Sequence, residues 1–256
     1  ASVFISMEKE MYEKAAWEGF QPFKITNILN QGTTMKSFEV EPEVALEIPE
    51  LVAGQYITVR VKPENDENLA LRHYSLYSVE NDGTLKFAVK KEGTGEKKGI
   101  VSHELHDNTS IGDSIEISAP AGDFKVNSEA GKELLLLSSG AGVTPMLAML
   151  EDEAKKGRKV NFVHVNESEA DVPFKTELTE INEKYDNVDV TYHLKLRDGY
   201  LTSDSLQHWI NENTDIYLCG GILFMDTIFD EFAKLNISQS DVNFEPFGPK
   251  MSITNV

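Results

Sequence analysis

The sequence contains a single cysteine, Cys219, among 256 residues. One cysteine cannot form an intrachain disulfide, and no charged start followed by an apolar run indicates a signal peptide. No stretch approaches the ~18 apolar residues that a membrane-spanning helix needs. These absences lead us to expect a cytoplasmic protein whose thiol stays reduced.

Basic residues are also scarce, since 24 Lys and Arg face 43 Asp and Glu and the net charge is −19. Because nucleic acids and anionic membranes bind clustered Lys and Arg, we expect neither as a partner. His103 and His106 have the i, i+3 spacing of metal ligands, but no third ligand is evident, so we expect no metal site.

Apolar residues at helical spacing predict an amphipathic helix over residues 3–17, with Phe4, Met7 and Met11 on its apolar side. An apolar stripe of this size needs a partner to cover it. The sequence leaves two alternatives open: the helix ends a longer unit, or it folds back onto its own domain.

In the rest of the chain the predicted secondary structure changes near residue 130. Up to about Val126, short β-rich runs separated by glycine turns predict an antiparallel barrel or sandwich. Such runs include Phe23–Ile28, Gln55–Val61, His73–Val79, Leu85–Val89 and Ser114–Ser118. Beyond Lys132, buried strands alternate with helices, which predicts a parallel sheet covered on both faces. The expected strands are Glu133–Ser138, Val160–Val165, Val188–Leu194, Ile216–Cys219 and Val242–Phe247. The expected helices begin at Pro145 and at Pro173, or span Ser205–Ile210 and Leu223–Leu235. The predicted fold is therefore an antiparallel barrel or sandwich followed by an α/β domain with a parallel sheet.

A glycine-rich segment, Ser138–Pro145, follows the apolar strand Leu134–Leu137 and opens the next predicted helix. Glycines at such a turn let the backbone approach a pyrophosphate, which the free N–H groups of the helix start can bind. The last glycine of G-x-G-x-x-G is replaced by Pro145, which suits the first helical position. A tight turn without a ligand is the alternative.

A second glycine-rich exit, Gly220-Gly221, follows the strand Ile216–Cys219 of the same predicted sheet. Ligands of open α/β sheets lie across the carboxyl ends of strands, so the two exits suggest one extended ligand. Cys219 is placed to reach a nicotinamide, or it is simply a small buried thiol.

Two segments of the barrel half carry groups suited to a phosphate and a ring. Arg72–Ser75 supplies a cation, an aromatic face and a hydroxyl, and Gly99–Ser102 opens a helix with a further hydroxyl. Each signal is weak alone, and a solvated ion pair is the alternative for Arg72. Lys90 and Lys91 end a strand, where they could approach a cofactor or remain solvated.

Together these motifs resemble the ferredoxin-NADP reductase superfamily, and most nearly the reductase portion of bacterial flavohaemoglobins. The segments that carry the resemblance are Gly54-Gln55-Tyr56, Arg72–Ser75, Ala88-Val89-Lys90, Ala119–Phe124, Gly142–Met149 and Phe244–Pro249. The resemblance runs from about Trp17 to the end, and residues 1–18 are similar to the last helix of the globin domain that precedes the reductase in that family. Cys219-Gly220-Gly221 departs from the Cys-Gly-Pro of many relatives, which leaves the backbone course there open.

The resemblance implies an FAD-binding barrel over residues 19–128 and an NAD(P)-binding α/β domain over residues 129–256. Residues implied to bind FAD are Tyr56, Arg72, His73, Tyr74, Ser75, Val89, Lys90, Gly99, Val101, Ser102, Pro246, Phe247, Gly248 and Pro249. Residues implied to bind NAD(P)H are Gly140, Ala141, Gly142, Val143, Thr144, Pro145, Cys219, Gly220 and Gly221. Those implied to act at the reacting rings are Tyr74, Ser75, Glu245 and Phe247.

The function that the resemblance implies is electron transfer from NADH through FAD to haem, for conversion of nitric oxide to nitrate. The haem would lie in a globin domain outside this chain, which would act as the electron acceptor. Glu167 and Glu169 follow the second strand of the α/β half and favour NADH, because carboxylates repel a 2′-phosphate, although Lys195 or Arg197 could reverse the preference. The alternatives are a stand-alone flavin, ferric or ferredoxin-type reductase and a non-catalytic flavin-binding module.

Overall fold

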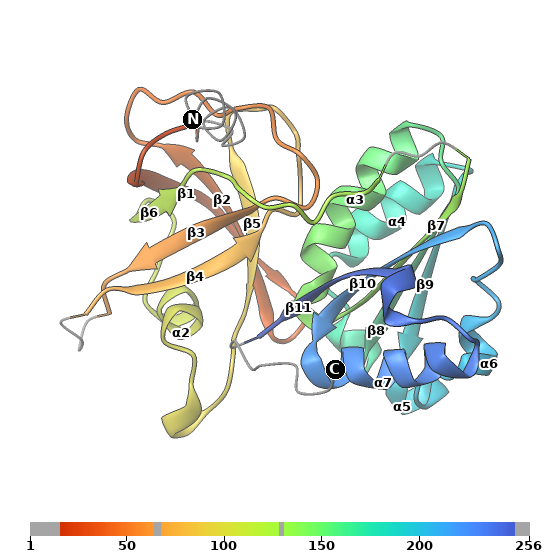
Figure 1. The fold of residues 1–256 in the computed structure, drawn as a ribbon. Helices are drawn as coiled ribbons and strands as arrows, with labels where there is room; N and C mark the ends of the chain where they lie inside the picture. Colours follow the sequence, from red (N-terminus) through yellow and green to blue (C-terminus); the bar gives the residue numbers. More distant parts are fainter. Residues whose placement is uncertain (1–15, 64–67, 128–130, 249–256) are drawn as a thin grey trace, which may run out of the picture.

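The structure is a computed structural model that describes residues 16–63, 68–127 and 131–248. These residues form a six-stranded antiparallel sheet followed by a five-stranded parallel sheet, side by side in Figure 1. The predicted order of an antiparallel domain and then an α/β domain is confirmed. No helix of the described ranges is long and apolar enough to cross a membrane.

The antiparallel sheet closes into a barrel. Its strands are β1 (Phe20–Gln31), β2 (Met35–Pro42), β3 (Tyr56–Val61), β4 (Ala70–Ser75), β5 (Leu85–Lys90) and β6 (Ser114–Ser118), in the order β4-β3-β6-β1-β2-β5. Leu76, directly after β4, forms an antiparallel bridge with Phe87 of β5 and joins the two edges. The short helix η1 (Gly95–Lys97) and α2 (Ile100–Asp107) lie between β5 and β6.

Strand β2 is not among the β-rich runs named from the sequence. Its signal is weak because buried positions alternate imperfectly: Met35, Ser37, Phe38 and Val40 are all buried. A polar Ser37 in the buried set and two adjacent buried residues break the period of two that marks a half-buried strand.

The second sheet is parallel and has helices on both faces. Its strands are β7 (Glu133–Ser139), β8 (Val160–Asn166), β9 (Val188–Leu194), β10 (Thr214–Gly221) and β11 (Val242–Phe247), in the order β11-β10-β7-β8-β9. The order reverses between β7 and β10, so the crevice expected of a doubly wound sheet lies at their carboxyl ends. Leu134 and Leu136 face one apolar cluster and Leu135 and Leu137 the other, which explains the continuous apolar run.

The helices of this domain are α3 (Val143–Lys155), α4 (Lys175–Lys184), α5 (Lys195–Asp198), α6 (Ser203–Leu206) and α7 (Ile222–Lys234), with short 3₁₀ turns η2 (Gly140–Gly142), η3 (Glu169–Asp171) and η4 (Gln239–Asp241). Three predicted boundaries were wrong. Helix α3 begins at Val143, which puts Pro145 third, still within the first turn where no N–H donor is needed. Helix α4 begins at Lys175, not Pro173, because Phe174 is left-handed, and the helix expected over Ser205–Ile210 is the single turn α6, rich in serine and aspartate.

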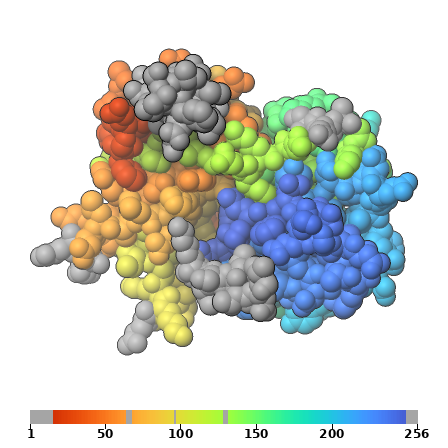
Figure 2. Space-filling view, viewed as in Figure 1, coloured from red at the N-terminus to blue at the C-terminus, as the bar shows by residue number. Residues whose placement is uncertain are grey.

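Helix α3 lies between its own sheet and the barrel, as Figure 1 shows. Every residue from Val143 to Leu150 is buried, which a helix shows only when it is covered on all sides. Met35, Ala53, Tyr77 and Ala88 of the barrel belong to the same apolar cluster as α3, and Figure 2 shows the two domains in contact along the middle of the molecule. The two domains therefore share one core.

The predicted N-terminal helix over residues 3–17 lies almost entirely outside the described residues. Its last two positions, Ala16 and Trp17, form an irregular bend. Trp17 is buried in the barrel core, where its ring lies 5.7 Å from that of Phe23 and its indole N–H donates to the carbonyl of Ile117 at 3.2 Å.

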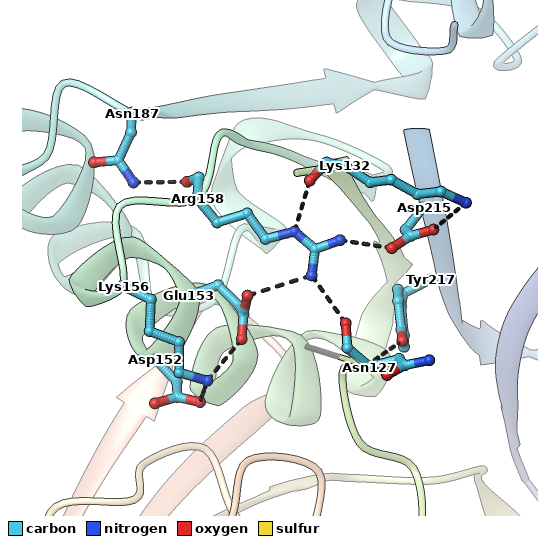
Figure 3. A network of polar contacts seen from close by, with 9 residues as sticks. All are labelled: Asn127, Lys132, Asp152, Glu153, Lys156, Arg158, Asn187, Asp215 and Tyr217. Carbon is cyan, nitrogen blue, oxygen red and sulfur yellow. Dashed lines mark hydrogen bonds and ion pairs between the residues drawn. The ribbon is translucent and has the colours of Figure 1, made fainter. Parts of the chain in front are cut away.

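A network of charges fixes the connection between the domains to the amino end of the parallel sheet (Figure 3). Arg158 donates to the carbonyls of Asn127 and Lys132 on either side of the connection, at 3.2 and 2.8 Å. The same guanidinium pairs with Asp215 at 2.6 Å and with the buried Glu153 at 3.4 Å. A single side chain thus satisfies two carboxylates and two carbonyls.

We predict that Arg158→Met lowers the free energy of unfolding by about 2 kcal/mol, because Glu153 and Asp215 lose the cation that they share. Each keeps a contact with a lysine, Glu153 with Lys156 at 2.8 Å and Asp215 with Lys132 at 3.3 Å, which limits the loss. Lys159→Met, which removes an exposed ion pair with Glu133, should cost less than about 0.5 kcal/mol. Urea unfolding gives the free energy of unfolding of both variants. Equal decreases in the two would contradict the role of Arg158.

Candidate functional site

The glycine-rich turn lies where β7 meets α3, as expected. A Cβ atom at Gly142 would lie 2.2 Å from the carbonyl oxygen of Cys219, so only glycine allows η2 to approach β10 this closely. Gly140 has a φ of +55°, a conformation that glycine adopts without strain. No side chain caps the start of η2 or of α3. The N–H of Val143 already donates to the carbonyls of Gly140 and Ala141, and Pro145 has no N–H, so we expect the donors for an anion at the start of η2, with Ala141 and Thr144 beside them.

The second glycine exit lies next to the first, since β10 pairs with β7. A Cβ at Gly220 would lie 2.6 Å from the ring of Phe224, whereas Gly221 has open space around it. Cys219 is fully buried, and burial raises the pKa of its thiol. This environment is that of the small buried thiol given above as its alternative.

The end of β11 completes this edge of the sheet and runs to the junction of the two domains (Figure 1). Glu245 pairs in register with Cys219, and Phe247 packs against the cluster that the domains share. Burial raises the pKa of Glu245. Pro246 and Gly248 adjoin these two residues, whereas Pro249 lies outside the described residues.

On the barrel side, β3 and β4 place the predicted ring-binding residues together. Tyr56 is opposite Ser75, and its ring lies 4.8 Å from the ring of His73. The Nδ1 atom of His73 is 2.8 Å from the hydroxyl of Thr58. Gly122, which the sequence analysis did not select, borders this group, because a Cβ there would lie 2.9 Å from the Tyr56 ring.

The side chain of Tyr74 points from β4 into the barrel, whereas that of Arg72 is exposed. The Tyr74 ring stacks on Phe87 at 5.7 Å, and burial raises the pKa of its hydroxyl. Arg72 is exposed and donates to the carbonyl of Leu71 at 2.8 Å. Among the described residues no carboxylate forms an ion pair with Arg72, so its charge is available to an anion.

The start of α2 is a second uncapped helix end, with Gly99 at its N-cap. Ser102 accepts from the N–H of Glu92 at 3.2 Å and donates to the carbonyl of Gly99 at 3.1 Å, so its hydroxyl holds the turn that shapes this end. The side chains of Val89 and Val101 lie in the barrel core, which leaves only their backbone for ligand contacts.

Lys90 connects the two halves of the site. Its ammonium group lies 3.6 Å from Glu92 and 4.0 Å from the position that a Cβ of Gly140 would occupy. A cation of the barrel therefore stands at the glycine turn of the α/β domain. By contrast, Lys91 turns away to pair with Asp107 at 2.6 Å.

His103 and His106 have structural contacts instead of a shared ligand. His103 lies 3.1 Å from the carbonyl of Gly93, and His106 lies 2.7 Å from the carbonyl of Val89. Both histidines thus tie α2 to the end of β5. No metal-binding cluster of His, Cys, Asp or Glu occurs within the ranges that the structure describes.

The sequence analysis also missed a buried polar pair beneath the glycine turn. The hydroxyl of Ser138 lies 2.8 Å from Nδ1 of His164, and both residues are fully buried. Burial lowers the pKa of His164 to about 4, so the ring is neutral at physiological pH. Its Nε2 atom has no hydrogen-bond partner in the described part of the chain. Apolar neighbours on both sides conceal this pair in the sequence.

Paired charges line the carboxyl end of β8. Glu167 forms an ion pair with Lys195, and Glu169 pairs with Lys175. Arg197 binds Asp198 at 2.6 Å instead of turning over β8 as a free cation. The two acids that follow β8 are therefore met by cations from α4 and α5.

The residues present fit two nucleotide cofactors. Two helix starts without a side-chain cap, α2 at Gly99 and the 3₁₀ turn η2 that leads into α3, supply N–H donors for two pyrophosphates, one in each domain. Lys90 adds positive charge at the Gly140 turn, Arg72 presents an exposed cation on β4, and the open space at Gly221 leaves room for an approaching ligand.

Comparisons with known proteins agree with this reading. Residues 23–126 match the family model described as an oxidoreductase FAD-binding domain, and residues 136–229 match the oxidoreductase NAD-binding domain. The chain is thus an NAD(P)H-dependent FAD oxidoreductase domain pair. It is 32% identical over 273 residues to the flavohemoprotein of Bacillus subtilis and 33% identical over 265 residues to that of Oceanobacillus iheyensis. The chain belongs to the flavohemoprotein family, as a reductase portion.

The matches cover nearly all of this chain but only part of the relatives. They include 99% of the chain and 67% of the Bacillus protein, and 97% of the chain and 65% of the Oceanobacillus protein. The structure resembles the flavohem-like FAD/NAD-binding domain of nitric oxide dioxygenase from Vibrio cholerae, with a TM-score of 0.81 and 29% identity over 90% of this chain and 99% of that one. It also shares its fold with the flavohaemoglobin of Malassezia yamatoensis, with a TM-score of 0.83 at 24% identity over 96% of this chain and 65% of that one.

Proposed function

We propose that this chain passes electrons from NADH through FAD to the haem of a globin domain, and so supports conversion of nitric oxide to nitrate. The observation that carries the proposal is the meeting of the two half-sites, where Lys90 of the barrel stands at the Gly140 turn of the α/β domain. The Vibrio domain that resembles this chain comes from a nitric oxide dioxygenase, which favours the same acceptor.

FAD, when bound, accepts a hydride from the nicotinamide and releases its electrons singly to an acceptor. Arg72 and the α2 start around Ser102 would hold its pyrophosphate, since both present donors that carboxylates do not occupy. Tyr56 and Tyr74 would contact the flavin ring, and Ser75 would donate to it near N5. The two hydrogen bonds of the Ser102 hydroxyl keep the helix start in place before the cofactor arrives.

The Gly140 turn would hold the NADH pyrophosphate, with Gly220 and Gly221 beside it. Glu167 is placed to accept from a 2′-hydroxyl, and it repels a 2′-phosphate. Because Lys195 already pairs with Glu167, and Arg197 with Asp198, a 2′-phosphate would have to displace a carboxylate to gain a cation. This arrangement supports a preference for NADH.

Glu245 and Phe247 would face the flavin on the side where the nicotinamide enters. Phe247 lies against the shared core and can cover an aromatic ring held between the domains. The partly buried Glu245 carboxylate would disfavour negative charge on the reduced flavin. It would thereby lower the flavin midpoint potential and favour electron transfer to the acceptor.

We predict that NADH bleaches the bound flavin in the absence of oxygen and that NADPH does so with a lower kcat/KM. Stopped-flow absorbance at the flavin bands measures both. A flavin that NADH leaves oxidised would favour the non-catalytic binding module, and a higher kcat/KM with NADPH would overturn the role of Glu167. A second experiment adds possible acceptors to the reduced protein: a separately purified ferric globin domain, free flavin, a ferric chelate or a ferredoxin. We expect the globin domain to reoxidise the flavin fastest. Faster reoxidation by one of the others would favour a stand-alone reductase.

We predict that Arg72→Ala weakens FAD binding roughly 10- to 100-fold, through loss of a charge-assisted bond worth about 1.5–3 kcal/mol. Arg60→Ala is the matched control, because Arg60 belongs to the same barrel but is bound to Glu116 at 2.6 Å. Equilibrium dialysis gives both FAD dissociation constants. Equal affinities in the two variants would remove Arg72 from the FAD site.

We predict that Glu245→Gln raises the flavin midpoint potential at neutral and alkaline pH without changing FAD content. The pKa of Glu245 is raised by burial, so its charge and its effect disappear as the pH falls through that raised pKa. The difference between variant and native midpoints should therefore be largest at high pH and vanish at low pH. Redox titration across pH measures it, with Glu133→Gln at the opposite end of the sheet as control. If the flavin midpoint potentials of Glu245→Gln and the native protein are the same at all pH values, Glu245 has only a structural role.

A further inference from the structure

Phe174 is a bulky residue in a backbone conformation that favours glycine. It is the N-cap of α4, with a φ of +54°, and its side chain is fully buried. Left-handed conformations cost an L-residue free energy because the Cβ atom crowds the backbone, and they persist only where surrounding contacts impose them. Phe174 must therefore have contacts that glycine would not supply.

Those contacts come from the other domain. The Phe174 ring lies 4.7 Å from the ring of Tyr77, which follows β4 of the barrel. Its backbone N–H donates to Oε1 of Gln31, at the end of β1, at 2.9 Å. Gln31 is itself buried and donates to Ser37 at 3.2 Å, which fixes the direction of its amide. The left-handed turn thus aims both the ring and the N–H of one residue at the barrel.

The neighbouring residues bring the two backbones together. A Cβ atom at Gly32 would lie 2.9 Å from the carbonyl oxygen of Asp171, and Thr33 donates to the Asp171 carboxylate. Asp171 also closes a capping box with Ser168, two residues after the end of β8. The hairpin between β1 and β2 is therefore held against the loop that leaves the coenzyme edge.

This contact lies apart from the connection fixed by Arg158 at the amino end of the sheet. The shared cluster around α3 also joins the domains, and contacts toward both ends of the parallel sheet limit the tilt of one domain against the other about that cluster. Tilt changes the gap between the glycine exits and the barrel residues that would hold the flavin. Because hydride transfer requires the reacting atoms to lie within about 3.5 Å, a small change in this gap changes the rate steeply.

We infer that Phe174 is a positioning residue that sets the distance across which the hydride passes from nicotinamide to flavin. The inference rests on the proposed function, and Phe174 itself need touch neither cofactor. Its strained turn, its ring and its N–H act together through Tyr77 and Gln31. The contact determines how closely the two half-sites face each other.

The test compares two Phe→Leu substitutions at fully buried positions. Phe174→Leu removes the ring at the domain contact, whereas Phe232→Leu removes one from α7 on the opposite face of the parallel sheet. We expect Phe174→Leu to lower the rate constant of anaerobic flavin reduction at saturating NADH about tenfold or more. We expect Phe232→Leu to change that rate constant less than about twofold while lowering the urea midpoint at least as much.

A readout independent of activity accompanies the rates. Hydrogen exchange of the backbone amides at residues 30–37 and 170–175 should accelerate in the FAD-bound Phe174→Leu protein and not in Phe232→Leu. The long-wavelength absorbance that arises when a nicotinamide stacks on a flavin should weaken in the first variant only. Phe174→Leu with accelerated exchange but a wild-type limiting rate would overturn the inference.

A second pair of variants decides the question where Phe174→Leu does not fold. Tyr77→Leu removes the partner ring from the barrel side and should reproduce the slow flavin reduction, whereas Tyr77→Phe keeps the ring and should reduce at the wild-type rate. Wild-type rates in both would overturn the inference. Failure of NADH to bleach the wild-type flavin would instead overturn the proposed function itself.

Discussion

The apolar cluster shared by the two domains is the constraint on which the site depends. Helix α3 contributes Val143, Met146 and Met149 to this cluster, and the barrel contributes Met35 and Ala88. The N-terminus of the same helix carries the glycine turn. Because one rigid element is buried against both domains, packing in the core directly positions the anion-binding end of the helix relative to the barrel. Site and core cannot vary independently here.

The architecture could be predicted from the sequence because its periodicities are strong. The apolar run Leu134–Leu137 and the alternation that followed it fixed the parallel sheet, and strands β9 and β11 have the predicted bounds. Strand β2 was not among the named runs because its buried positions do not alternate. The start of α4 was misplaced because nothing in the local sequence reveals that Phe174 is left-handed. Its conformation is imposed by Gln31 and Tyr77, which lie in the other domain.

The same distinction applies to the candidate site. Glycines and the residues beside them could be found from local chemistry, since turns and helix starts are local features. The position of Lys90 at Gly140 could not, because it depends on how two domains meet. The sequence offered Lys195 and Arg197 as cations for the acids after β8, and only the folded sheet shows that Lys195 pairs with Glu167 while Arg197 binds Asp198. Local motifs identify which groups are present, and tertiary packing decides which of them face one another.

Because the chain is strongly acidic, the ion pairs of its few cations determine where it can bind phosphates. A protein with a net charge of −19 repels nucleotide phosphates at long range, so affinity must come from groups at the site. At physiological ionic strength, charges beyond about 8 Å are largely screened, which reduces the distant carboxylates to a minor effect. The affinity for phosphates therefore depends on the charges next to the site. There Arg72 lacks a carboxylate partner among the described residues, and Lys90 has only a long contact with Glu92. Most other cations of the described chain, such as Lys91, Arg158 and Lys195, are already bound closely to carboxylates. Ion pairing elsewhere thus reduces the positive charge that is available, and Lys90 is one of the cations that keep theirs, at the contact of the two domains where two anionic cofactors would have to meet.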